Sequence, residues 1–207
     1  MPSTLFHAAI GGLIAAALIH ERFDRRVLLV VAAAVLVPEL DVFVGLWIRG
    51  AHRAYTNNVF VPLAFAALVY YDTSIRSRSW LRERWGPDAE HIAWVGVVVL
   101  AVAGIGLDLF YNGVNLFFPV IDRFYSLSGK VVLSDHRGLV QTVVDVHAAK
   151  GTTATRQYWT GVDPKPATPG PEPASVERVF PIASTGVQLL LTIVGFAVVA
   201  YRLWREE

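Results

Sequence analysis

Two carboxylates and a proline interrupt an apolar stretch of the chain, in the sequence Val-Pro-Glu-Leu-Asp at residues 37–41. The surrounding run, residues 27–48, is long and apolar enough to span a membrane. An ionised acid near the middle of such a span costs roughly 2.5–3.5 kcal/mol on insertion scales unless something neutralises it. Glu39 and Asp41 therefore need partners inside the protein.

Four other residues could supply these partners, and each lies near an end of an apolar run: His7, His52, Arg53 and Asp108. Imidazoles and carboxylates bind divalent metals, and the chain has no cysteine that could add a thiolate. Two interpretations stay open. The residues form a membrane-embedded metal site, or they form a proton-sharing polar network that only holds helices together.

Pro38 affects the directions in which the side chains of Glu39 and Asp41 point. In a regular helix, residues two positions apart point about 200° from each other, so Glu39 and Asp41 would not share a face. Proline removes a backbone hydrogen bond and bends or opens the helix. We therefore expect a locally opened helix that aims both carboxylates at one point, and we expect Thr56 to cap the next helix.

The composition identifies a membrane protein, because 54% of the residues are hydrophobic, 17% are charged and the mean hydropathy is +0.47. A net charge of +1 gives no basic field, so we expect no nucleic-acid partner. The predicted fold is an all-α membrane protein with about five transmembrane helices. They correspond to residues 4–19, 27–48, 58–71, 92–111 and 186–204, of which the first and third are short for a bilayer.

Arginine-rich connections predict the orientation. They follow the first and third helices and end the chain, which places the N-terminus outside and the C-terminus in the cytoplasm of a multi-pass cell-membrane protein. We expect a four-helix core at residues 1–120, an extracytoplasmic loop at 121–182, and a final transmembrane helix at 183–207. Within the loop, residues 130–133 and 139–147 predict a β-hairpin, and the proline-rich residues 162–174 predict a stiff linker.

This topology brings the polar residues to one side of the membrane, although they were singled out by type alone. His7, Asp41, His52, Arg53 and Asp108 all fall at the outer side. On the opposite side, the segment between the third and fourth helices mixes arginine with tryptophan, a composition that suits the lipid headgroup layer.

The same residues, in the same order, resemble the YdjM-like family of membrane-bound, metal-dependent hydrolases. The likeness covers residues 1–120 and rests on four features: His7 in a small apolar helix, Pro-Glu-Leu-Asp at 38–41, His-Arg-Ala-Tyr-Thr-Asn at 52–57, and Leu-Asp-Leu-Phe-Tyr-Asn-Gly at 107–113 followed by Pro119. It implies a helical membrane protein that binds a divalent metal and hydrolyses an unknown substrate.

Three positions depart from the family pattern. Glu39 stands where the family usually has Asp, Asn57 where it has His, and Gly104 where it has His four residues before the acid. The loss of two imidazoles would reduce a dinuclear site to a mononuclear one, or abolish it. Asn57 and the loop residues Asp135 and His136 are further candidates for the site, and Asp145 and His147 of the same loop could also substitute.

The resemblance predicts the chemistry as follows. Zn²⁺, with Mn²⁺ or Mg²⁺ as alternatives, would be held by His7, Asp41, His52 and Asp108. Glu39 is the expected general base and Arg53 the expected clamp for an anionic group, for which the location favours the phosphate of a lipid ester. The competing hypotheses are a catalytically degenerate scaffold that binds a partner, and an ion or proton path through Glu39, Asp41 and Asp108.

Overall fold

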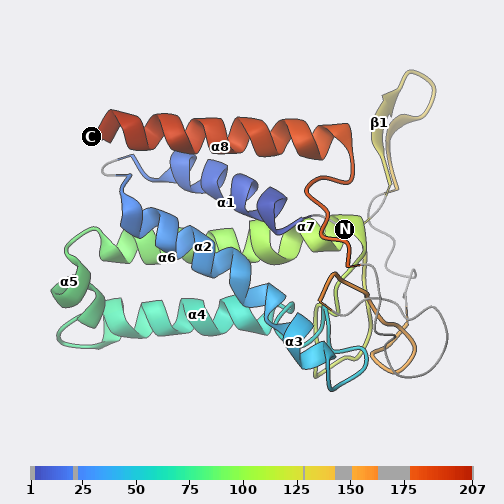
Figure 1. The fold of residues 1–207 in the computed structure, drawn as a ribbon, viewed down its shortest axis with the longest axis horizontal. Helices are drawn as coiled ribbons and strands as arrows, with labels where there is room; N and C mark the ends of the chain where they lie inside the picture. Colours follow the sequence, from blue (N-terminus) through green and yellow to red (C-terminus); the bar gives the residue numbers. More distant parts are fainter. Residues whose placement is uncertain (1–2, 21–22, 128, 143–150, 163–177, 207) are drawn as a thin grey trace.

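The computed structural model describes residues 3–20, 23–127, 129–142, 151–162 and 178–206, and these residues are mostly helical. Five helices lie side by side and run alternately in opposite directions (Figure 1). They are α1 (Thr4–Leu18), α2 (Arg25–Glu39), α4 (Phe60–Tyr70), α6 (Ala89–Val99) and α8 (Gly186–Glu206).

Shorter elements extend these helices or cap the ends of the bundle. The helix α6 continues through a π-helical segment, η2 (Leu100–Gly106), into α7 (Leu107–Tyr111), and α4 continues into a π-helical turn, η1 (Tyr71–Ile75). At one end of the bundle lies α3 (Asp41–Gly45) and at the other lies α5 (Trp80–Trp85), as Figure 1 shows. We call these the α3 end and the α5 end.

Side-chain caps fix where several helices begin. Ser3 accepts a hydrogen bond from Phe6 N (3.1 Å) at the start of α1, and Asp24 accepts one from Arg26 N (2.8 Å) at the start of α2. Close backbone approach then joins α8 to α1. A Cβ on Gly195 would lie 2.7 Å from the carbonyl oxygen of Ala9, so only glycine allows the two helices to approach this closely.

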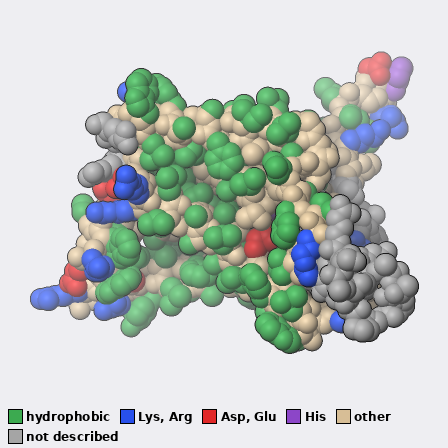
Figure 2. Space-filling model, in the orientation of Figure 1, with side chains coloured by type: hydrophobic (Ala, Val, Ile, Leu, Met, Phe, Trp, Pro, Cys, Tyr) green, Lys and Arg blue, Asp and Glu red, His purple; other side chains and the backbone are tan. Residues whose placement is uncertain are grey.

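The lengths of the helices revise the expected number of spans. Among the residues that the structure describes, three segments are long and apolar enough to cross a membrane: Arg25–Gly45, Ala89–Tyr111 and Gly186–Arg205. The helices Thr4–Leu18 and Phe60–Ile75 are apolar but shorter, so the structure confirms a mostly helical fold with helices able to cross a membrane and leaves the five-span count a prediction. Figure 2 agrees, since apolar side chains cover the flank of the bundle and Lys and Arg gather towards its two ends.

The predicted hairpin is present. Strands β1 (Val131–Ser134) and β2 (Gly138–Gln141) pair antiparallel and project from the α3 end (Figure 1). The second predicted strand was longer, but residues 143–147 lie outside the described part of the chain. The predicted linker also lies almost wholly outside it, since residues 163–177 are not described.

Candidate functional site

The polar residues converge at the α3 end, where α1 begins and both α2 and α7 finish (Figure 1). His7, Asp41, His52, Arg53 and Asp108 are all buried there. The predicted gathering of these side chains at one end of the bundle therefore has a direct counterpart in the fold.

The helix α2 ends at the predicted proline break. Leu40 separates α2 from α3, and the Thr56 hydroxyl spans the gap: it donates to the Pro38 carbonyl (2.8 Å) and accepts from Asp41 N (3.2 Å). The expected capping role of Thr56 is thus wrong. At the start of α4 it is Asn58 Oδ1 that accepts a hydrogen bond, from Phe60 N (3.0 Å).

His7, Glu39 and Asp108 form a group that could hold a metal ion. One ligand atom from each residue lies within 4.8 Å of the other two. His7 Nδ1 lies 2.6 Å from the carbonyl oxygen of Ala103, in η2. Since a carbonyl only accepts, Nδ1 must carry the proton, and a neutral ring then presents the lone pair of Nε2, which lies 3.6 Å from Asp108 Oδ1.

Asp41 and His52 form a second group beside the first. His52 Nδ1 donates to Asp41 Oδ1 (2.8 Å), and the other carboxylate oxygen accepts from Arg53 N (2.9 Å). The opened helix therefore does not aim both acids at one point, because Glu39 joins His7 and Asp108 while Asp41 binds the loop after α3. Two predicted ligands, His7 and Asp108, meet with Glu39 as third member, whereas Asp41 and His52 pair with each other.

Arg53 joins the two groups. Its Nη2 donates to Asp108 Oδ1 (2.6 Å) and its Nη1 to the carbonyl oxygen of Gly113 (3.3 Å). Its backbone has φ = +67°, an uncommon conformation for a residue with a side chain. Hydrogen bonds hold it there, from Arg53 N to Asp41 and from Asn115 N to the Arg53 carbonyl (2.8 Å).

Tyr158, which the sequence did not single out, covers this cluster. The Arg53 guanidinium carbon lies 4.9 Å from the centre of its ring, and the His52 ring meets the same ring edge-on at 6.2 Å. Burial raises the pKa of the Tyr158 hydroxyl, which stays neutral and donates to the Asn112 carbonyl (2.6 Å). No periodicity or motif marks this residue, because its position depends on how the loop after α7 returns to the bundle.

Contacts account for the residues at two of the three positions that depart from the resembled pattern, those where a His was expected. Asn57 Nδ2 donates to Asp108 Oδ2 (3.0 Å), so Asn57 belongs to the cluster as a hydrogen-bond donor. Gly104 packs against the proline break, where an added Cβ would lie 3.0 Å from Pro38 Cγ. A larger side chain at Gly104 would require α2 and η2 to separate.

Asp135 and His136 lie elsewhere. They occupy the turn of the β1–β2 hairpin, with side chains 86% and 89% exposed and a distance of 3.5 Å between Asp135 Oδ2 and His136 Nε2. The hairpin projects away from the buried cluster (Figure 1), so these residues do not replace the missing imidazoles in this arrangement. Asp145 and His147 lie outside the described residues.

Four buried polar atoms of the cluster have no hydrogen-bond partner among the described residues: His7 Nε2, His52 Nε2, Arg53 Nε and Asn57 Oδ1. Each such orphan typically costs about 1–3 kcal/mol. Two of the four are imidazole nitrogens whose lone pairs could bind a metal ion, and Arg53 Nε could donate to an oxygen of a ligand. The cluster therefore has unpartnered atoms that suit a bound ion and an oxygen-bearing ligand.

No family model, curated protein or solved structure matches the chain.

Proposed function

We propose that the chain is a membrane-embedded, metal-dependent hydrolase whose ion is held by His7, Glu39 and Asp108. The observation that carries the proposal is the close approach of these three ligand atoms, all within 4.8 Å, with His7 oriented by the Ala103 carbonyl. Nitrogen with carboxylate oxygen is a ligand set of Zn²⁺, and the two carboxylates also suit Mn²⁺ or Mg²⁺.

The charge of the cluster supports a divalent ion. Three carboxylates, on Glu39, Asp41 and Asp108, accompany one guanidinium, on Arg53. In the protonation state that metal binding requires, with neutral imidazoles and ionised acids, an excess of two negative charges remains at this end of the bundle. One divalent cation would balance that excess, and an unbalanced charge of this size is costly in a protein interior.

The residues divide the work as follows. A metal held here would supply Lewis acidity and would lower the pKa of water. His52, held by Asp41 through Nδ1, keeps Nε2 as a proton acceptor and takes the general-base role expected of Glu39, which now serves as a ligand. Arg53 would bind an anionic group through its unused Nε, and a phosphoester of a lipid at the outer membrane surface is the proposed substrate.

Metal analysis of the purified protein tests the ligand assignment. After supplementation with Zn²⁺ or Mn²⁺, we expect near-stoichiometric metal in the wild type and its loss in His7→Ala. His136→Ala is the matched control, since it removes an exposed imidazole far from the cluster. His52→Ala is expected to keep the metal but lose hydrolysis of a phosphodiester in lipid vesicles, which separates proton transfer from metal binding.

One observation favours a second candidate, a polar scaffold without catalysis. Asp108 is already paired with Arg53 and Asp41 with His52, and protons on the two imidazoles would balance the remaining charge. In that case the folded wild type would bind no metal after supplementation. His7→Ala would then alter stability alone, and the hydrolase proposal would be abandoned.

A further inference from the structure

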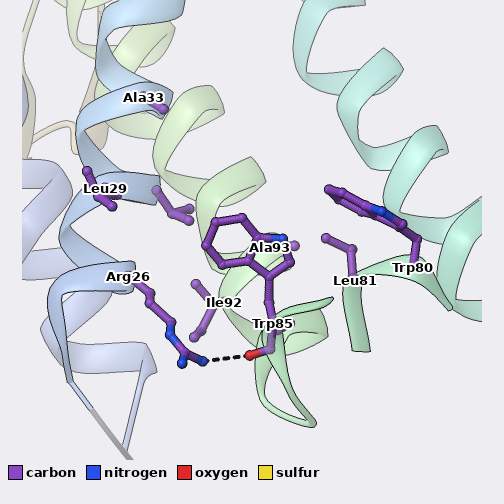
Figure 3. Close-up of a pocket in the computed structure, with 10 residues that line it drawn as sticks. Arg26, Leu29, Ala33, Trp80, Leu81, Trp85, Ile92 and Ala93 are labelled. Carbon is purple, nitrogen blue, oxygen red and sulfur yellow. Dashed lines mark hydrogen bonds between the residues drawn. The ribbon is translucent and has the colours of Figure 1, made fainter. Parts of the chain in front are cut away.

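A mostly apolar pocket lies at the α5 end, at the opposite end of the bundle from the polar cluster. It has a volume of about 290 Å³ and is enclosed by α2, α5 and α6 (Figure 3). Its walls include Leu29 and Ala33 of α2, Trp80 and Trp85 of α5, and Ile92 of α6. None of these residues takes part in the proposed hydrolase chemistry.

The pocket opens on the flank of the bundle. Leu29 is 65% exposed and Trp80 is 52% exposed, although both line an apolar cavity. The residues of α2 and α6 that line it belong to two of the three segments able to cross a membrane. Hydrocarbon is therefore the surrounding medium that suits these walls, because exposing them to water would be unfavourable.

Arg26 is the one charged residue among those that line the pocket, and Figure 3 shows it at the end nearest α5. Its Nη1 donates to the Trp85 carbonyl (2.6 Å), and its side chain is 54% exposed. Asp24 and Arg26 form an ion pair, with Asp24 Oδ2 3.9 Å from Arg26 Nε, which is too long for a hydrogen bond, so N–H donors of the guanidinium remain for a second anion. Tryptophan beside arginine is typical of the level at which lipid headgroups begin.

We propose that this pocket binds one acyl chain of an anionic phospholipid, with the phosphate of that lipid at Arg26. The volume lies just below the range of roughly 300–1,000 Å³ of small-molecule pockets, so it suits part of one chain and not a whole lipid. A helix from a protein partner, about 10–12 Å across with its side chains, would not enter a space of this size. The acyl chain lies along the apolar walls of the pocket, and the lipid phosphate contacts Arg26 near the end of the span that contains α2.

Two matched pairs of variants on α2 test the site. Arg26→Gln removes the cation that lines the pocket, while Arg25→Gln removes an exposed neighbouring arginine that does not line it. Ala33→Phe fills the pocket, while Ala32→Phe adds the same ring to an exposed neighbouring position outside it. Each protein is incubated with an equal mixture of phosphatidylglycerol and phosphatidylcholine, and retained lipid is counted by native mass spectrometry.

We expect the wild type to retain one phosphatidylglycerol in preference to phosphatidylcholine. Arg26→Gln should reduce that preference about fivefold, the effect of one arginine near an anionic headgroup. Ala33→Phe should abolish retention of the lipid, and both controls should match the wild type. The proposal is overturned if the wild type shows no preference, or if either control has the same effect as its partner. Should Ala33→Phe fail to fold, the two exposed arginine variants decide the question.

Discussion

Replacing Arg53 with methionine would remove the cation that joins the two halves of the polar cluster. Arg53 Nη2 lies 2.6 Å from Asp108 Oδ1, and both side chains are almost completely buried. Removing one partner of a buried ion pair typically costs about 3–5 kcal/mol, because the other charge is left uncompensated. We therefore expect Arg53→Met to lose about that much stability in metal-free conditions.

The same substitution should have the opposite effect on metal binding. The guanidinium and a metal would both interact with Asp108, so they repel each other across a shared oxygen. At a separation of about 5 Å and an effective dielectric constant of about 20, each unit of charge contributes about 3 kcal/mol of repulsion. Since about 3 kcal/mol corresponds to about a hundredfold in affinity, loss of Arg53 should tighten binding of a divalent metal by at least about a hundredfold.

Two measurements check this pair of expectations. Unfolding of the detergent-solubilised protein, free of metal, gives the change in stability, and calorimetric titration with Zn²⁺ gives the change in affinity. Arg49→Met is the control, since Arg49 is exposed at the same end and its loss should change stability by no more than about 0.5 kcal/mol. If Arg53→Met were as stable as this control, the buried ion pair would contribute nothing. If its metal affinity fell, Arg53 would support the ion and not compete with it.

Two further substitutions test, first, a hydrogen bond that positions the site and, second, a carboxylate at the α5 end. Thr56→Val keeps the shape of the side chain but removes the hydroxyl that joins the Pro38 carbonyl to Asp41 N, so thermal unfolding should show a loss of about 1–3 kcal/mol. Asp72 lies at the α5 end, outside the three long spans. Its pKa is lowered from near 3.8 to about 2, chiefly by a hydrogen bond from the Ser79 hydroxyl. Because the folded carboxyl has the lower pKa, its stabilising effect is present above pH 4 and is lost as the pH falls towards 2. Asp72→Asn should therefore unfold more easily than the wild type at neutral pH, and the difference should shrink as the pH falls through 2 and vanish below it.

Much of the helical architecture could be predicted from the sequence, because burial in a membrane and burial in a protein both select apolar residues. The runs around α2, α6 with α7, and α8 each correspond to a helix of spanning length. Hydropathy could not give the exact helix ends. Ser3 caps α1, and Asn58 Oδ1 accepts a hydrogen bond from Phe60 N at the start of α4; both helices are shorter than a span.

The sequence predicts which residues gather at the site better than it predicts which of these residues pair with each other. Residue type alone identifies buried acids and imidazoles in apolar runs, since each needs a partner there. Which partner each acid takes depends on the loop after α3, where the left-handed backbone of Arg53 directs its N–H to Asp41 and its guanidinium to Asp108. No local sequence pattern specifies that conformation, and none predicts that Tyr158 covers the polar cluster.

The break at Leu40 explains why one short motif can serve two purposes. If α2 continued as a regular helix, Glu39 and Asp41 would point about 200° apart, and one of them would face lipid. By stopping α2 at Glu39 and starting α3 at Asp41, the chain turns one acid towards His7 and the other towards the loop that carries His52. Glu39 is consequently free to bind an ion while Asp41 orients the imidazole beside it. The position of Arg53, bound to both groups, then couples them: in the proposed hydrolase, a cation held by the first group would weaken the contact between Asp108 and the guanidinium and release the guanidinium towards an anionic substrate.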